Sequence, residues 1–237
     1  ILIGWHLSKK YFITKHEIKE KFDDYLTYVI LGIIIGGRLG YVIFYNFNYY
    51  INNFSEIFKI WQGGMSFHGG LLGVTAVIFL YSRANKIKFL SLADFVAPLV
   101  PAGLFFGRLG NFVNQELYGR ATDVPWAMIF PADPLRLPRH PSQLYEAFLE
   151  GILLFIIVYI FARRPRSSGQ VAGIFLVFYG FFRFLVEFVR QPDAQFLNKQ
   201  ALFPMFDWMT RGQLLCIPMI LLGLWFLRNL YSTKAKE

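Results

Sequence analysis

The chain consists largely of long apolar runs separated by shorter polar segments. Six runs approach the length of about 20 mostly apolar residues that a membrane-spanning helix needs. They predict helices at residues 25–45, 65–82, 91–108, 145–162, 171–190 and 211–230. A shorter run at 1–7 is typical of the end of a further helix, and the sequence does not begin with Met. The pattern predicts an all-α polytopic membrane protein with seven transmembrane helices in the intact chain, the first truncated here.

Composition supports this class. The AVILMFWYC set makes up 55% of the residues and Asp, Glu, Lys and Arg make up 16%, against about 25% charged residues in a soluble domain. A soluble domain of this length would lack the polar surface to cover itself. We therefore expect residues 1–237 to form one transmembrane domain, with extracytoplasmic segments at 108–144 and 190–210.

The basic residues indicate how the helices are oriented. Lys and Arg number fourteen across the segments 8–24, 83–90, 163–170 and 228–237, and eight across 46–64, 108–144 and 190–211. Because cytoplasmic loops carry the excess of Lys and Arg, the first group is predicted to be cytoplasmic. This placement accounts for the net charge of +9 without nucleic-acid binding, and it puts the C-terminus inside.

Ionisable residues interrupt or border all but one of the apolar runs. Such groups cost several kcal/mol at membrane depth unless they face protein or water, so they point to function. They are Arg38, Asp94, Glu146, Glu150, Arg183 and Glu187. In the predicted orientation His68, Arg108, Tyr145 and Arg183 all fall toward the outer leaflet.

The segment 107–120, GRLGNFVNQELYGR, concentrates polar residues at the end of the fourth helix. Its Arg108 offers a planar fork of donors suited to phosphate. The alternative is a capped helix end whose arginine reaches the membrane surface. Two Arg, two Asn, one Gln and one Glu within fourteen residues favour a binding site. The tetrapeptide GRLG also occurs at 37–40, which makes Arg38 a second candidate cation.

Three further segments carry candidate chemistry. His68 in SFHGGLLG could serve as a general base near neutral pH or could pack beside its glycine pair. Arg183, Glu187 and Arg190 share one helix face, either as an ion-pair ladder or with the arginines directed at a ligand. In HPSQLYEA, residues 140–147, Ser142 is expected to cap the fifth helix. Tyr145 suits the interfacial aromatic belt as well as a substrate contact.

Metal chemistry is not expected from this sequence. The four histidines form no H-E-x-x-H motif and no pair spaced four apart, and Cys216 is the single cysteine. We predict no metal and no cofactor.

Taken together, these blocks resemble a known family. The run GRLGNFVNQELYG at 107–119 is similar to the signature of bacterial prolipoprotein diacylglyceryl transferases, and FHGGLLG (67–73), HPSQLYEA (140–147) and RFLVEFVRQPDAQF (183–196) resemble its other blocks in the same order. The resemblance covers nearly the whole chain. Family members also carry a Tyr-containing first-helix segment that this sequence lacks.

The resemblance implies an activity in the bacterial inner membrane. The family transfers the sn-1,2-diacylglyceryl group of phosphatidylglycerol to the lipobox cysteine in prolipoprotein signal peptides, leaving a thioether and glycerol phosphate. It implies catalytic roles for His68, Arg108 and Arg183. The substrate-binding set that we predict is Arg108, Asn111, Glu116, Gly119, Arg38, Tyr145, Glu187 and Arg190.

Buried arginines alone fit a second class of protein equally well, a small transporter or channel with an anion site. A transporter would favour discontinuous helices near the membrane midplane, whereas these polar residues are predicted to gather at one leaflet. An intramembrane hydrolase would need a Ser or Asp nucleophile at depth, and none is convincing here.

Overall fold

The computed structural model describes residues 22–164, 166–191 and 209–234. They fall into two compact units that divide between Ala93 and Asp94, and each unit is described by itself. The predicted helix remnant at 1–7 and most of the predicted segment 190–210 lie outside the described residues.

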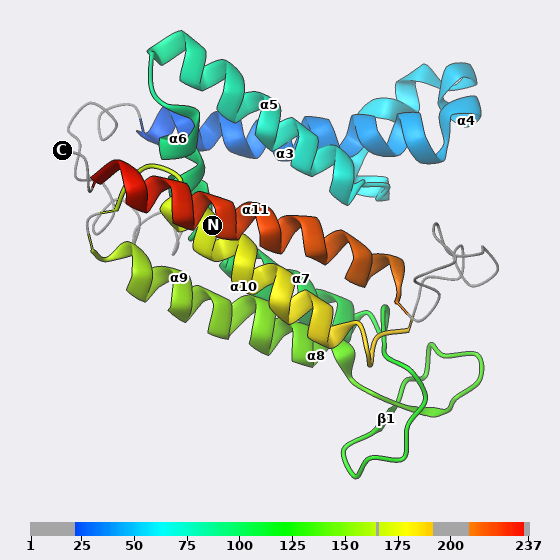
Figure 1. Cartoon of the computed structure of the whole chain (residues 1–237). Helices are drawn as coiled ribbons and strands as arrows, with labels where there is room; N and C mark the ends of the chain where they lie inside the picture. Colours follow the sequence, from blue (N-terminus) through cyan, green and yellow to red (C-terminus); the bar gives the residue numbers. More distant parts are fainter. Residues whose placement is uncertain (1–21, 165, 192–208, 235–237) are drawn as a thin grey trace. The chain divides into compact units, whose positions relative to one another are not determined.

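The first unit is built on two long helices, α3 (Phe22–Tyr45) and α5 (Phe67–Asn85), which lie side by side (Figure 1). Between them run α4 (Phe47–Asn52) and the short 3₁₀ turns η1 (Phe54–Phe58) and η2 (Ile60–Gln62). The helix α6 (Phe89–Val96) follows, and the hydroxyl of Tyr25 on α3 donates a hydrogen bond to the carbonyl of Leu92 (3.1 Å).

Glycines let α3 and α5 approach closely. A Cβ atom at Gly36 would lie 2.5 Å from the carbonyl oxygen of Gly69 and 2.8 Å from the Cα of Gly73. Since apolar side chains gain little by leaving lipid for protein, close backbone packing of small residues is what holds such helix pairs together in a membrane.

The second unit contains α7 (Val100–Val113), the two-stranded hairpin β1 (Met128–Ile129) and β2 (Pro138–Arg139), and a long helix in three parts. Those parts are α8 (Ser142–Glu146), the π-helix η3 (Ala147–Leu153) and α9 (Leu154–Ala162). The helices α10 (Gln170–Val186) and α11 (Arg211–Lys234) complete it.

Small residues also join α10 to α11, which run alongside each other (Figure 1). A Cβ atom at Gly223 would lie 2.7 Å from the carbonyl oxygen of Gly173. The start of α10 is held by Asp94, whose carboxylate accepts hydrogen bonds from the N–H groups of Gly169 (2.6 Å) and Ala172 (2.8 Å). A carboxylate is favourable there because the N-terminus of a helix presents unpaired N–H groups.

The helices match the predicted spans. Three are long and apolar enough to cross a membrane, Asp23–Tyr45, Phe67–Asn85 and Ser142–Ala162. The predicted helix 91–108 is a bent pair, α6 and α7, at a break that contains Pro98; the remaining two predictions correspond to the shorter apolar helices Gln170–Val186 and Gly212–Arg228. Many large apolar side chains on these helices are exposed, including Leu72, Ile160 and Leu215. The prediction of an all-α membrane protein is confirmed.

Two adjacent glycines test the packing of α3 against α5. A Cβ atom at Gly69 would overlap the Gly36 carbonyl and lie 2.8 Å from the Cα of Gly40, whereas at Gly70 the nearest atom is 3.6 Å away. We expect Gly69→Ala to lower the free energy of unfolding by about 1–3 kcal/mol through overpacking. Gly70→Ala, the matched control, should match or exceed the wild-type melting temperature in detergent. Equal melting temperatures for the two variants would contradict this packing.

Candidate functional site

Three arginines and three glutamates meet inside the second unit, and Glu146 lies at the centre. Its Oε2 lies 3.0 Å from Nε of Arg108, its Oε1 accepts a hydrogen bond from Nη1 of Arg183, and the same oxygen lies 3.7 Å from Nε of Arg190. Arg108 belongs to α7, Glu146 to α8 and Arg183 to α10. The cluster therefore joins three separate helices.

The other two glutamates extend this arginine–glutamate cluster. Glu150 lies 3.8 Å from Nη2 of Arg108 and 3.8 Å from Nη1 of Arg183. Glu187 lies 3.0 Å from Nη2 of Arg183, one helical turn away, as the spacing predicts. The N-terminal end of α11 covers Glu187, because a Cβ atom at Gly212 would lie 2.7 Å from its carboxylate.

Burial separates the two kinds of residue in the cluster. The side chains of Glu146 and Glu150 are 0% exposed, whereas those of Arg108, Arg183 and Arg190 are 18%, 16% and 12% exposed. The partly exposed arginines can thus still contact a ligand, whereas Glu146 and Glu150 pair with them from fully buried positions. Buried ion pairs stabilise a fold little better than apolar packing would, so a cluster of this size points to function.

The local helix geometry aligns the two buried glutamates. Glu146 ends α8, and Glu150 lies within η3, where hydrogen bonds run from residue i to i+5. This wider turn brings residues four apart nearer to one side of the helix than an α-turn does. π-Helical turns often occur at functional sites.

The loop that follows α7 is tied to the same cluster. Nη1 of Arg108 donates a hydrogen bond to Oδ1 of Asn111 (3.5 Å), and Nδ2 of Asn111 donates one to Oε1 of Glu116 (2.9 Å). Gln115 and Leu117 adopt left-handed backbone angles, φ 58° and 57°. A strained backbone of this kind persists only where its surroundings impose it.

Buried side chains of α8 impose that conformation. The hydroxyl of Ser142 donates a hydrogen bond to the carbonyl of Leu117 (3.1 Å), and the amide of Gln143 donates one to the carbonyl of Glu116 (2.7 Å). The prediction that Ser142 caps the fifth helix is wrong. The N-cap residue is Pro141, without a side-chain cap, because the Ser142 hydroxyl is used on the loop instead.

Gly119 fastens the loop to the end of α10. Its N–H donates to the carbonyl of His140 (2.9 Å), and it forms an antiparallel bridge with Arg190. A Cβ atom at Gly119 would lie 2.6 Å from the carbonyl oxygen of Val189, so only glycine fits here. Among the predicted substrate-binding residues, Gly119 therefore acts through its backbone.

Tyr145 has polar partners outside the cluster. Its hydroxyl accepts a hydrogen bond from the indole N–H of Trp126 (2.7 Å) and lies 3.3 Å from Nδ1 of His140. Tyr145 thereby links the loop to the start of the long helix.

A separate ion pair shapes the β1–β2 hairpin. Nε of Arg139 lies 2.6 Å from Oδ2 of Asp133, and its Nη2 donates to Oδ1 (3.1 Å). The guanidinium also lies over the ring of Tyr118, 4.8 Å from its centre. The hydrogen bonds from Arg139 lower the pKa of Asp133 to about 2, so this carboxylate is ionised at neutral pH.

Arg38 is the arginine of the predicted site that lies in the first unit, and its donors are taken by backbone carbonyls. Nε donates to Ile57 (2.7 Å), Nη1 to Gly63 (2.6 Å) and Nη2 to Glu56 (2.6 Å), and the side chain is buried. Arg38 therefore fixes the course of residues 54–64. Its predicted role in substrate binding stays a prediction.

His68 lies at the second position of α5, in the same unit as Arg38. The side chain is exposed and its ring makes an edge contact with Phe67. The helix start is capped by Ser66, whose hydroxyl accepts a hydrogen bond from the N–H of Gly69 (3.1 Å). The exposed imidazole is accessible to a proton donor.

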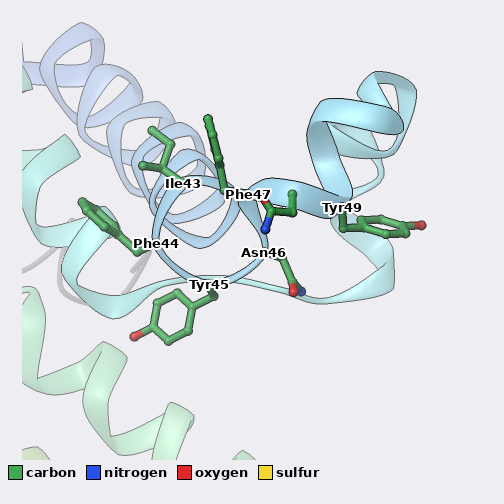
Figure 2. Close-up of a pocket in the computed structure, with 7 residues that line it drawn as sticks. Ile43, Phe44, Tyr45, Asn46, Phe47 and Tyr49 are labelled. Atoms are coloured by element: carbon green, nitrogen blue, oxygen red, sulfur yellow. The ribbon is translucent and has the colours of Figure 1, made fainter.

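A hollow at the junction of α3 and α4 is a different feature. It is lined by residues 43–49, and Figure 2 shows that they include Phe44, Tyr45 and Phe47. These seven residues carry no charge and include no predicted site residue. The hollow therefore offers no cationic side chain to a phosphate.

The structure thus brings together most of the site predicted from sequence. Arg108, Arg183, Arg190, Glu187 and their loop partners lie in the second unit, whereas Arg38 and His68 belong to the first. Glu146 and Glu150 were not among the residues predicted for the site. Their signal was present, because each is an acidic residue within an otherwise apolar run.

Comparisons with known proteins agree with these observations. A family model described as prolipoprotein diacylglyceryl transferase matches residues 1–228. A phosphatidylglycerol–prolipoprotein diacylglyceryl transferase of Nitratidesulfovibrio vulgaris is 55% identical over 229 residues, covering 96% of this chain and 85% of the relative. Proteins of the same name from Pseudomonas putida (53% identical) and Azotobacter vinelandii (55%) cover 91% and 92% of this chain and 79% and 80% of their own lengths.

The Asp133–Arg139 pair makes the stability of the hairpin depend on pH. Because the folded pKa of Asp133 is lowered to about 2 from about 3.9 in an unfolded chain, its stabilisation is present above pH 4 and is lost as the pH falls toward 2. We expect Asp133→Asn to lower the melting temperature at pH 7. The difference from wild type should narrow between about pH 4 and pH 2. A difference that stays constant across that range would show that Asp133 acts other than through its charge.

Proposed function

The chain belongs to the prolipoprotein diacylglyceryl transferase family, and we propose that it transfers the diacylglyceryl group of phosphatidylglycerol to the lipobox cysteine of prolipoproteins. The arginine–glutamate cluster is the observation that carries this proposal. Arg108 and Arg183 come from different helices, and the side chain of each is partly exposed. The planar fork of an arginine can donate two parallel hydrogen bonds to the non-bridging oxygens of a phosphodiester.

The reaction exchanges one bond for another. The cysteine sulfur attacks the glyceryl carbon that carries the phosphate, a carbon–sulfur bond forms and the carbon–oxygen bond to phosphate breaks. Glycerol phosphate leaves with the electron pair, and the thiol proton passes to a base. Negative charge grows on the departing phosphate, and Arg108 and Arg183 stabilise it, with Arg190 assisting. This chemistry requires no cofactor or metal.

His68 is proposed as the base. A free thiol has a pKa of about 8.5, and the thiolate is the nucleophile, so a base that accepts the thiol proton assists at neutral pH. Its exposed position at the start of α5 leaves the ring accessible to a proton donor. Arg38 is proposed to support substrate binding indirectly, because its hydrogen bonds to backbone carbonyls fix the course of the segment 54–64.

The remaining predicted residues position the substrates. Asn111 and Glu116 support Arg108, Gly119 fastens the loop to Arg190, and Glu187 orients Arg183. Tyr145 stands at the loop side of the site, where the signal peptide would approach. We place the protein in the bacterial inner membrane as a multi-pass chain, with residues 108–144 and 190–210 outside and the site toward the outer leaflet. The distribution of Lys and Arg between the loops supports this orientation.

A transfer assay tests the proposal against an anion transporter or channel. The purified full chain is incubated with phosphatidylglycerol vesicles and a peptide that carries a lipobox cysteine. The enzyme releases glycerol phosphate and produces a thioether-linked peptide, whereas a transporter produces neither. A peptide with Ser in place of the cysteine is the control, because its hydroxyl is a far weaker nucleophile.

Substitution of Arg108 tests the requirement for a fork. Arg108→Lys keeps the charge but lacks the planar fork that can meet Glu146 through Nε and a phosphate through its other nitrogens. We expect it to lower the transfer rate by about 100-fold or more, nearly as far as Arg108→Ala does. Near wild-type transfer by the lysine variant would mean that a positive charge alone is sufficient at this position.

Substitution of His68 tests the base. His68→Gln should fold, bind phosphatidylglycerol and lose transfer at neutral pH by about 10²–10⁴-fold. Raising the pH toward the pKa of the thiol should restore part of the rate, because thiolate then forms without help. The pH–rate profile, the melting temperature and lipid binding are measured on one preparation. A folded, lipid-binding variant whose deficit is constant from about pH 6.5 to 9 would exclude His68 as the base.

A further inference from the structure

Glu146 occupies a position that no other described residue shares. Among the carboxylates that the structure describes, it alone forms ion pairs of 4 Å or less with all three arginines of the cluster. Its two oxygens are divided between helices, Oε2 toward Arg108 on α7 and Oε1 toward Arg183 on α10. One carboxylate thus sets the distance and angle between two guanidinium groups that come from different helices.

The way in which Arg108 is held decides which of its atoms remain available. Glu146 contacts Arg108 through Nε, and the terminal Nη1 makes only a long hydrogen bond of 3.5 Å to Asn111. Nη2 lies 3.8 Å from Glu150, beyond hydrogen-bond distance, so the Nη edge of the fork can still donate to an oxyanion. An arginine that lost the contact at Nε could rotate about its side-chain bonds, and its two donors would no longer match a phosphate.

Glu150 provides an internal comparison. It has the same charge, is equally buried and faces the same two arginines, but both distances are 3.8 Å. Within the described part of the chain, neither oxygen of Glu150 has a hydrogen-bond partner. Glu146 has one, because its Oε1 accepts from Arg183, while its Oε2 meets Arg108 as a 3.0 Å ion pair. Glu150 therefore adds negative charge near Arg108 and Arg183 without fixing their orientation.

We propose that Glu146 is a positioning residue, which holds the Arg108 and Arg183 forks in the arrangement that receives the phosphate of the lipid substrate. This inference rests on the proposed function. It does not require Glu146 to touch either substrate, because its side chain is fully buried behind the arginines. An orienting role of Glu146 differs from simple charge compensation, because Glu150 could compensate the charge of the arginines equally well.

The test compares Glu146→Gln with Glu150→Gln in the full-length protein. Each variant removes one negative charge from the same cluster, and each keeps the shape of the side chain. The transfer assay is run at varied phosphatidylglycerol with the lipobox peptide in excess, and then the reverse, so that kcat and both KM values are obtained. Melting temperatures are measured on the same preparations.

For Glu146→Gln we expect kcat/KM for phosphatidylglycerol to fall about 10- to 100-fold, the effect of losing a charge-assisted contact. The KM for phosphatidylglycerol should rise while the KM for the peptide stays at the wild-type value. Glu150→Gln should show a clearly smaller change in the KM for phosphatidylglycerol. A purely structural role of Glu146 would reduce the fraction of folded enzyme, which lowers the apparent kcat and leaves both KM values unchanged.

Glu146→Asp covers the case in which Glu146→Gln does not fold. It keeps the charge and both oxygens but is one methylene shorter, so the fold should survive and the KM for phosphatidylglycerol should still rise. An unchanged KM in the folded variants, an equal rise in Glu150→Gln, or failure of both Glu146 variants to fold would each overturn the proposal. An inactive wild-type chain would instead reject the proposed function itself, so the two failures are distinguishable.

Discussion

The pairing of buried charges constrains the second unit more than any other interaction. A guanidinium or a carboxylate at membrane depth is costly unless an opposite charge lies against it. Arg108, Arg183 and Glu146 satisfy this requirement only when α7, α8 and α10 are held together. The arrangement of these helices and the chemistry of the site thus have the same physical origin.

Close helix packing makes such pairing possible. An arginine and a glutamate on different helices meet only if the backbones hold a fixed separation. A glycine provides this between η3 and α7, where a Cβ atom at Gly151 would lie 2.7 Å from the Cβ of Phe105, and glycines also join α10 to α11 at Gly173 and Gly223. The same device joins α3 to α5 through Gly36 and Gly69. The apolar outer surface contributes little to this specificity, because lipid solvates it equally well in any arrangement.

The loop after α7 shows how a polar segment is positioned over such a cluster. Residues 115–117 take a strained course that buried Ser142 and Gln143 impose. Gly119 then docks against Arg190 at the end of α10. Each of these contacts involves a backbone group of the segment, so its backbone conformation is fixed directly and does not depend on its side chains alone. A site assembled in this way is organised before a ligand arrives, which favours binding and transition-state stabilisation.

The sequence by itself determined where the helices lie along the chain and which polar residues are candidates for the site. Apolar runs of spanning length are a one-dimensional property, so the helices near 25–45, 65–82 and 145–162 could be predicted. The spacing of Arg183 and Glu187 likewise fixes a contact within one helix. Only the tertiary structure decided that Glu146 lies between Arg108 and Arg183. The same is true of Arg38, which donates its hydrogen bonds to backbone carbonyls of residues 54–64. Both depend on which segments distant in sequence become neighbours, and periodicity along one chain carries no information about that.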